Sequence, residues 1–106
     1  MSSLTDRERD FENRYVHDQE LRFRIEARRN RLVGLWAAEK LGMPDAEAKT
    51  YAQDIVRASF MQAGDNDVFE KVRDDLAKGQ VPQSEHQIRR TIEEMLALAE
   101  QQIMAE

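Results

Sequence analysis

The stretch LTDRERDFENRYVHDQELRFRIEARRNRLVGLWAAEKLG, Leu4 to Gly42, fills more than a third of the 106-residue chain and decides its fold. Thr5 and Glu8 have the spacing of a capping box, which begins a helix. The next glycine or proline is Gly34, so the helical pattern can run unbroken to Gly42. Residues 32–41 are apolar on nearly every side, whereas the residues before them are mostly charged. The sequence therefore predicts one long helix of which only the second half has a core to pack into.

The rest of the chain predicts three more helices, with no alternating pattern of a strand. Capping and breaking residues mark the boundaries of these helices: Gly42, Pro44, Asp45, Gly64, Asp65 or Asn66, Gly79, and the capping box Ser84 and Gln87. The short loops between them favour antiparallel neighbours in a compact bundle. We predict an all-α fold, a four-helix bundle in which Trp36 is the largest core anchor.

The composition narrows the class of protein. There is no cysteine and there are only two histidines, which excludes disulfides and argues against a structural zinc site. No apolar run approaches the roughly 18 residues needed to cross a bilayer, and the N-terminus lacks the pattern of a signal peptide. We expect a cytoplasmic protein that binds no metal and does not insert directly into a membrane.

The net charge of −5 is unevenly distributed along the chain. Residues 1–20 carry six acidic and three basic side chains, residues 21–40 carry two and six, and residues 41–106 carry thirteen and seven. A basic collar therefore lies between two acidic regions, and it consists of Arg22, Arg24, Arg28, Arg29 and Arg31. The collar favours a local anionic contact, while the acidic remainder argues against general affinity for nucleic acid.

The first half of the long helix has little apolar surface. At about 100° per residue, its apolar stripe falls within an arc of roughly 120°. This stripe comprises Leu4, Phe11, Tyr15, Leu21, Ile25, Leu32, Val33 and Trp36. The pairs Asp10–Arg14, Asp18–Arg22 and Glu20–Arg24 add only about 0.3–0.5 kcal/mol each, too little to hold some twenty solvated residues firmly helical. We therefore expect residues 1–20 to be a mobile, partly disordered arm or frayed helix when free, and residues 21–106 to form the bundle.

Two interpretations of this arm are open from its residues. It could fold back and pack on the bundle as an ordinary amphipathic helix, although Phe11 is the only bulky apolar residue between residues 5 and 14. Alternatively, Phe11 and Tyr15, four residues apart on a charged helix, could anchor the arm in a groove of a partner.

Other motifs point more weakly to function. The run RRNR at 28–31 is better explained as a solvated helix face or a docking patch than as a phosphate site. The run GDND at 64–67 is not a calcium loop, because Leu76 stands where such a loop needs a glutamate. His17 could sense pH, but a solvated histidine is the simpler explanation. No pattern of catalytic residues supports an enzyme.

The first forty-odd residues closely resemble the zeta subunit family of alphaproteobacterial ATP synthases, small proteins that inhibit ATP hydrolysis. The resemblance is densest at Asp6, Arg7, Glu8, Phe11, Glu12, Asp18, Glu20, Leu21 and Phe23, and in the runs EARRN (26–30) and LWAAEKLG (35–42). The chain departs mildly from the family pattern: Tyr15-Val16 replaces a usual Phe-Ala pair, and arginine replaces a common lysine at positions 14, 24 and 31.

The resemblance implies an inhibitor subunit of the F-type ATP synthase, not an enzyme. Its N-terminal helix would enter a catalytic interface between the alpha and beta subunits, near gamma, while the bundle docks on the catalytic head. The implied inhibitory residues are Leu4, Asp6, Arg7, Glu8, Arg9, Asp10, Phe11, Tyr15 and Asp18. The protein would be a monomer when free and would reach the cytoplasmic face of the inner membrane only through ATP synthase.

The sequence leaves two other classes of protein open. The first is a nucleotide- or small-molecule-binding helical sensor with its ligand near the basic collar, which leaves weak nucleotide binding open although we expect no cofactor. The second is a nucleic-acid-binding helix, which the acidic net charge disfavours.

Overall fold

Four helices make up the fold of the computed structural model, which describes the backbone of residues 3–61 and 65–106 and the side chains of residues 17–60 and 67–106. They are α1 (Ser3–Lys40), α2 (Asp45–Met61), α3 (Asp65–Lys78) and α4 (Glu85–Ala105). No strand occurs within these ranges. The predicted all-α fold with four helices is confirmed.

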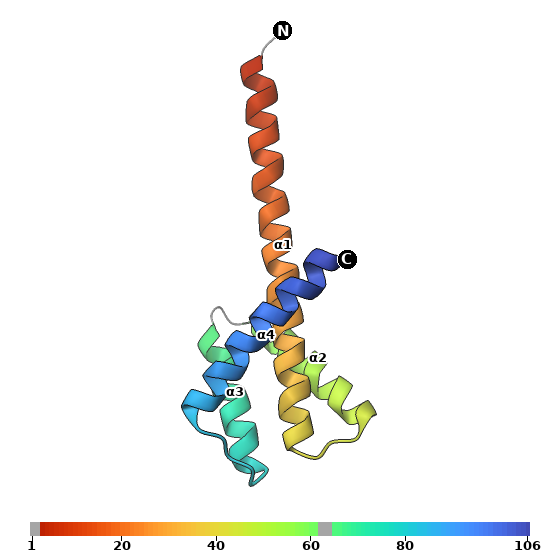
Figure 1. Cartoon of the computed structure of the whole chain (residues 1–106), viewed down its shortest axis with the longest axis vertical. Coiled ribbons are helices and arrows are strands. Elements are labelled where there is room, and N and C mark those ends of the chain that lie inside the picture. Colours follow the sequence, from red (N-terminus) through yellow and green to blue (C-terminus); the bar gives the residue numbers. More distant parts are fainter. Residues whose placement is uncertain (1–2, 62–64) are drawn as a thin grey trace.

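Helix α1 is the central element of the molecule (Figure 1). It packs mainly against α2 and α4, while α3 completes the bundle through smaller contacts with the other three helices. The N-terminal half of α1 projects beyond the bundle, and the molecule measures 66 × 24 × 22 Å along its principal axes. This projection is consistent with a mobile arm and differs from the fold-back alternative. The division of the chain at residue 20 stays a prediction.

Capping residues bound the C-terminus of α1 and the N-terminus of α4 where the sequence predicts, whereas α1 begins at Ser3, before the predicted capping box of Thr5 and Glu8. Gly42 has a φ of 73°, and the Met43 N–H donates to the Ala38 carbonyl at 3.0 Å while the Gly42 N–H donates to Glu39 at 3.0 Å. This is the Schellman pattern, which satisfies the last carbonyls of α1. At the start of α4, the Gln87 N–H donates to the Ser84 hydroxyl oxygen at 3.0 Å.

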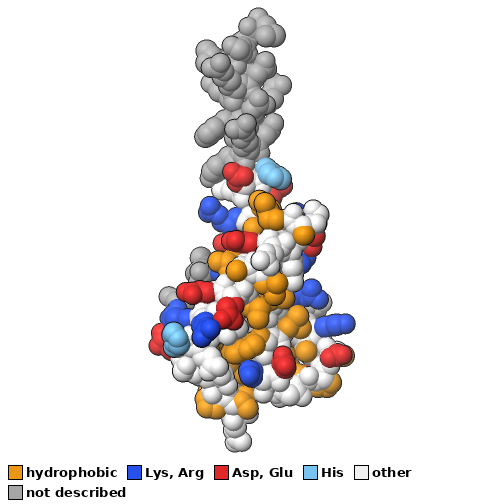
Figure 2. Space-filling model, viewed as in Figure 1, with side chains coloured by type: hydrophobic (Ala, Val, Ile, Leu, Met, Phe, Trp, Pro, Cys, Tyr) orange, Lys and Arg blue, Asp and Glu red, His pale blue; other side chains and the backbone are white. Residues whose placement is uncertain are grey.

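The core is built from medium-sized aliphatic side chains. Its largest fully buried members are Val33, Ile55, Val72, Leu76 and Ile88. Trp36 packs against this cluster but stays partly exposed, so it lies at the rim of the core and not at its centre. In Figure 2, the apolar side chains that stay visible gather on the bundle and charged side chains surround them.

Helices α1 and α2 approach each other closely at Gly34. Gly34 is buried, and a Cβ atom at this position would lie 2.8 Å from the Cα of Ala52 and 3.3 Å from Cγ1 of Ile55. Such a short distance to backbone leaves no room for a methyl group. The absence of a side chain at Gly34 therefore lets the two helices pack closely at the level of the core.

Replacing Gly34 by alanine should destabilise the bundle. Alanine raises helix propensity by about 1 kcal/mol, but overpacking a tight site costs about 1–3 kcal/mol, so we expect a net loss of up to about 2 kcal/mol in urea unfolding. The reverse change Ala97→Gly, at an exposed position of α4, measures the propensity effect alone. A stabilised Gly34→Ala variant would show that the contact with Ala52 yields easily.

Candidate interface at the base of the arm

The predicted inhibitory residues lie in the N-terminal half of α1. The backbone of Leu4, Asp6, Arg7, Glu8, Arg9, Asp10, Phe11 and Tyr15 is helical, and their side chains lie outside the described part of the chain. Residues 17–20, including Asp18, are exposed, and Leu21 is the first partly buried residue of the described segment. The inhibitory roles of these residues stay predictions.

The basic collar does not form one continuous exposed patch. Arg22, Arg24 and Arg31 are exposed. Arg29 is only 5% exposed, and its Nε and Nη2 donate to Oδ1 of Asn30 at 3.0 and 2.9 Å. A buried guanidinium held in this way serves the structure of α1, so Arg29 does not reach a partner's surface in this arrangement.

Two collar residues bind the end of α4. Arg24 Nη2 lies 2.8 Å from one carboxylate oxygen of Glu106, and Arg28 Nη2 lies 2.6 Å from the other. Arg28 also donates to Oε1 of Gln102 at 2.8 Å. The hydrogen bond from Arg28 holds the pKa of the Glu106 carboxyl below its ordinary value of 4.5, with a further contribution from Arg24. These contacts connect α4 to α1 where the arm leaves the bundle.

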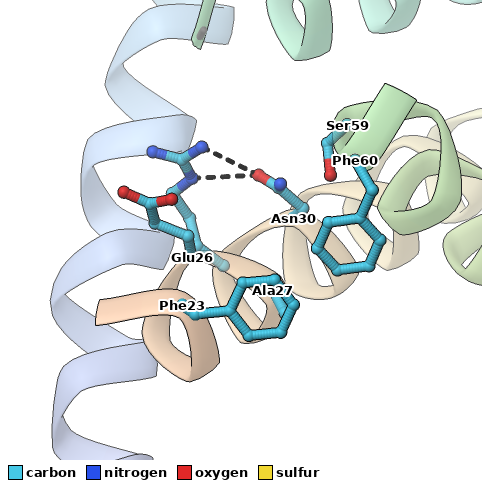
Figure 3. Close-up of a pocket in the computed structure, with 7 residues that line it drawn as sticks. Phe23, Glu26, Ala27, Asn30, Ser59 and Phe60 are labelled. Carbon is cyan, nitrogen blue, oxygen red and sulfur yellow. Dashed lines mark hydrogen bonds between the residues drawn. The ribbon is translucent and has the colours of Figure 1, made fainter. Parts of the chain in front are cut away.

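An exposed aromatic pair lies beside the collar. Phe23 of α1 and Phe60 of α2 are each 54% exposed, and their rings stack with centroids 4.9 Å apart and planes 13° from parallel. Figure 3 shows the two side chains pointing toward each other from the two helices. The sequence did not indicate this pair as a site, because Phe23 lies off the apolar stripe of α1. An aromatic residue on the charged face of a helix was the signal that could have revealed it.

Two hollows flank Phe23. The smaller, of about 210 Å³, is shown in Figure 3 and is lined by Phe23, Glu26, Ala27, Arg29, Asn30, Ser59 and Phe60. The larger, of about 470 Å³, is lined by Phe23, Arg24, Ala27, Arg28, Arg31, Gln53, Val56 and Ile103. The base of the arm is thus a surface that combines exposed aromatic rings, a groove and arginines.

The described residues offer no sign of a metal centre or a membrane span. No group of three or more histidine, cysteine, aspartate or glutamate side chains among them could hold an ion. No helix within these ranges is both long enough and apolar enough to cross a bilayer. His17 and His86 are both exposed.

Comparison with known proteins identifies the family. The family model for ATPase inhibitor subunit zeta matches residues 1–102 of the chain. The chain belongs to the ATPase inhibitor subunit zeta family. Among solved structures, a solution NMR structure of a protein is similar to the chain, with 42% sequence identity and a TM-score of 0.70. That match covers 80% of this chain and 96% of the other. No curated protein sequence matches the chain.

Membership of the zeta family confirms the resemblance seen in the first forty-odd residues and extends it along nearly the whole chain. It supports a role as an ATPase inhibitor, and so a regulatory subunit that binds ATP synthase. The match includes residues 1–20, where the sequence predicts the inhibitory arm.

The contact between Arg28 and Glu106 predicts a measurable change in the pKa of Glu106 when Arg28 is replaced. Because the pKa of Glu106 is lowered in the folded state, its contribution to stability is present above pH 4.5 and is lost as the pH falls through the lower, folded pKa. Arg28→Gln should raise the pKa of Glu106 toward its ordinary value, as followed by NMR titration of the side-chain carboxyl carbon. The matched variant Arg90→Gln, at an exposed arginine that pairs with Glu94, should leave it unchanged. Equal titration curves in both variants would contradict the assigned cause.

Proposed function

We propose that this protein blocks ATP hydrolysis by inserting the N-terminal part of α1 into a catalytic interface between the alpha and beta subunits of ATP synthase, near gamma. One observation carries the proposal. A single continuous helix is buried in the core at Val33 and Ala37, and its other end projects away from the bundle. A helix fixed at one end and projecting at the other can enter a crevice while the bundle stays outside.

The proposed mechanism is a wedge. Rotary hydrolysis requires a catalytic interface to open and close, and a helix held within that interface would prevent the opening. Phe11 and Tyr15 would be the apolar anchors, each contributing about 2 kcal/mol if fully buried at a hot spot. The charged residues from Asp6 to Asp10 would pair with charges lining the crevice, which sets register and association rate more than affinity.

The bundle would make the wedge effective. Ordering a frayed arm costs conformational entropy, which weakens binding of the arm by itself. A docked bundle would hold the arm beside the crevice and so raise its effective concentration there. The buried half of α1 and the contacts of Arg24 and Arg28 with Glu106 support this arrangement, because they fix the root of the arm to the bundle.

The remaining parts of the proposal concern setting and partners. The protein would act as a monomer on the catalytic head of ATP synthase, at the cytoplasmic face of the inner membrane. Arg22 and Arg31, two of the three exposed members of the collar, would face acidic surface at the mouth of the crevice. The net charge of −5 supports a protein partner over nucleic acid.

Removing the arm should abolish inhibition. Full-length protein added to the ATPase of its own organism should suppress hydrolysis, whereas a version that begins at Leu21 should not. Because α2 packs on the part of α1 around Gly34, circular dichroism should show a folded bundle in the shortened version. Full inhibition by that version would exclude the arm from the mechanism.

A single anchor can be tested without truncation. Phe11→Ala should raise the concentration needed for half-maximal inhibition by about 10- to 30-fold, which corresponds to the loss of a hot-spot contact. The melting temperature of the free protein should stay nearly unchanged, since residue 11 belongs to the N-terminal half of α1, the half that projects beyond the bundle. Loss of both inhibition and thermal stability would instead favour an arm that packs on its own bundle.

A further inference from the structure

The stacked pair Phe23 and Phe60 forms an exposed surface that the proposed insertion of the arm does not explain. Each side chain exposes more than half of its area, although both rings lie on well-packed helices. Aromatic side chains are enriched at protein interfaces and are common among the residues that dominate binding energy. Two adjacent exposed rings therefore suggest a surface that a partner covers.

This aromatic pair is held in place before any partner binds. Phe23 lies on α1, about three turns from the close contact between Gly34 and Ala52, and Phe60 lies in the last turn of α2. Because that contact fixes the two helices to each other, the rings meet at a defined separation of 4.9 Å. A surface that is already ordered loses little entropy on binding.

A groove continues from the rings between two helices. No Cα atom of α2 comes within 8 Å of one in α4 over the described ranges, so these helices flank α1 without meeting. The space of about 470 Å³ between them has Ala27 of α1, Val56 of α2 and Ile103 of α4 among its lining residues. An apolar groove between helices suits an amphipathic helix with a few apolar anchors.

The charges around the groove select an acidic occupant. Arg24, Arg28 and Arg31 line it, and the carboxylate that Glu106 places between Arg24 and Arg28 shows that this edge binds such groups at 2.6–2.8 Å. Arg31 is exposed and forms no ion pair with any described side chain. Residues 21–40 carry four more basic than acidic side chains in a chain whose net charge is −5.

We infer that Phe23, Phe60 and the adjoining groove, together the aromatic platform, dock an acidic amphipathic helix on the catalytic head of the ATPase. One apolar side chain of that helix covers the stacked rings, and its carboxylates face Arg31 and the Arg24–Arg28 edge. This inference rests on the proposed function and names the surface by which the bundle, as distinct from the arm, binds the head.

The test measures binding and inhibition separately with full-length variants. Phe23→Gln and Phe60→Gln should each weaken binding to the purified catalytic head roughly tenfold, measured by calorimetry or biolayer interferometry. At saturating concentrations both variants should still inhibit hydrolysis fully, because the arm is unchanged. The matched control Met104→Gln removes an apolar side chain that is 69% exposed on α4, and it should change binding less than twofold.

A second pair of variants tests the charge of the partner. Arg31→Glu should weaken binding to the head at low salt, and the difference from wild type should shrink as salt is raised. Arg90→Glu makes the same change in net charge at a position on α4 that is 70% exposed, and it should have little effect. Equal effects of the two substitutions would overturn the acidic partner.

The remaining outcomes separate this inference from the function on which it rests. If wild-type protein neither binds nor inhibits the head, the proposed function fails. If wild-type protein does both and the two phenylalanine variants bind as Met104→Gln does, only the docking inference is overturned.

Two other occupants would also overturn the inference. The first is a nucleotide. If ATP shifts the NMR signals of groove residues in wild type but not in Arg31→Glu, and the phenylalanine changes leave binding to the head unaffected, the groove is a nucleotide site. A dimer that sedimentation detects in wild type and that Phe60→Gln abolishes would assign the platform to a second copy of the chain.

Discussion

The close contact between Gly34 and Ala52 is the constraint on which the rest of the structure depends. At this point α1 and α2 approach until a methyl group no longer fits between them, and the neighbouring α1 residues Ala37 and Ala38 are completely buried as well. Small residues at a helix crossing allow the backbones to come close, so that the core around Val33 and Ile55 can close between α1 and α2. Because α1 is fixed here, the direction in which it leaves the bundle is fixed relative to α2.

Burial along the described part of α1 decreases from residues 33–38 toward residues 17–20. Residues 33–34 and 37–38 are buried, Leu21 and Ile25 are half-buried, and residues 17–20 are exposed. Apolar burial is worth about 25 cal/mol per Å², so the stabilisation that tertiary packing gives this helix falls steadily toward its N-terminus. The same helix therefore serves as a core element at one end and, at the other, as a segment whose helical state depends on what it contacts. No hinge residue is needed between these two roles, because the amount of apolar contact alone distinguishes them.

The number and ends of the helices could be predicted because short-range signals determine them. Gly42 ends α1 with a left-handed residue, and Ser84 begins α4 with its hydroxyl group. The packing could not be predicted in the same way, since a helical wheel ranks residues by polarity and size and not by their neighbours. It made Trp36 the anchor of the core, whereas the small residues of α1 at the crossing with α2 move the centre to Val33 and leave Trp36 at the rim. It also treated Arg29 as a collar residue like the others, although α1 places this side chain in the interior. The stack of Phe23 on Phe60 joins two helices, and its existence depends on a register that neither helix encodes alone.

The two proposed contacts of this protein are linked by the helix that carries both. Phe11 and Tyr15 precede Phe23 by twelve and eight residues, which is about 18 and 12 Å along an unbroken helix. If α1 stays helical across this interval, the platform and the anchors are held at one fixed distance and angle from each other. Each contact can then assist the other only when the ATPase presents its crevice and its acidic helix at that same distance and angle. If the interval is frayed, the platform can bind first, and helix formation then proceeds outward from the docked end, where α1 already supplies the nucleus that an isolated helix lacks. The second order of events avoids the unfavourable nucleation step and tolerates the motion of a rotary partner. The weak stabilisation of the arm therefore favours docking of the bundle before insertion of the arm.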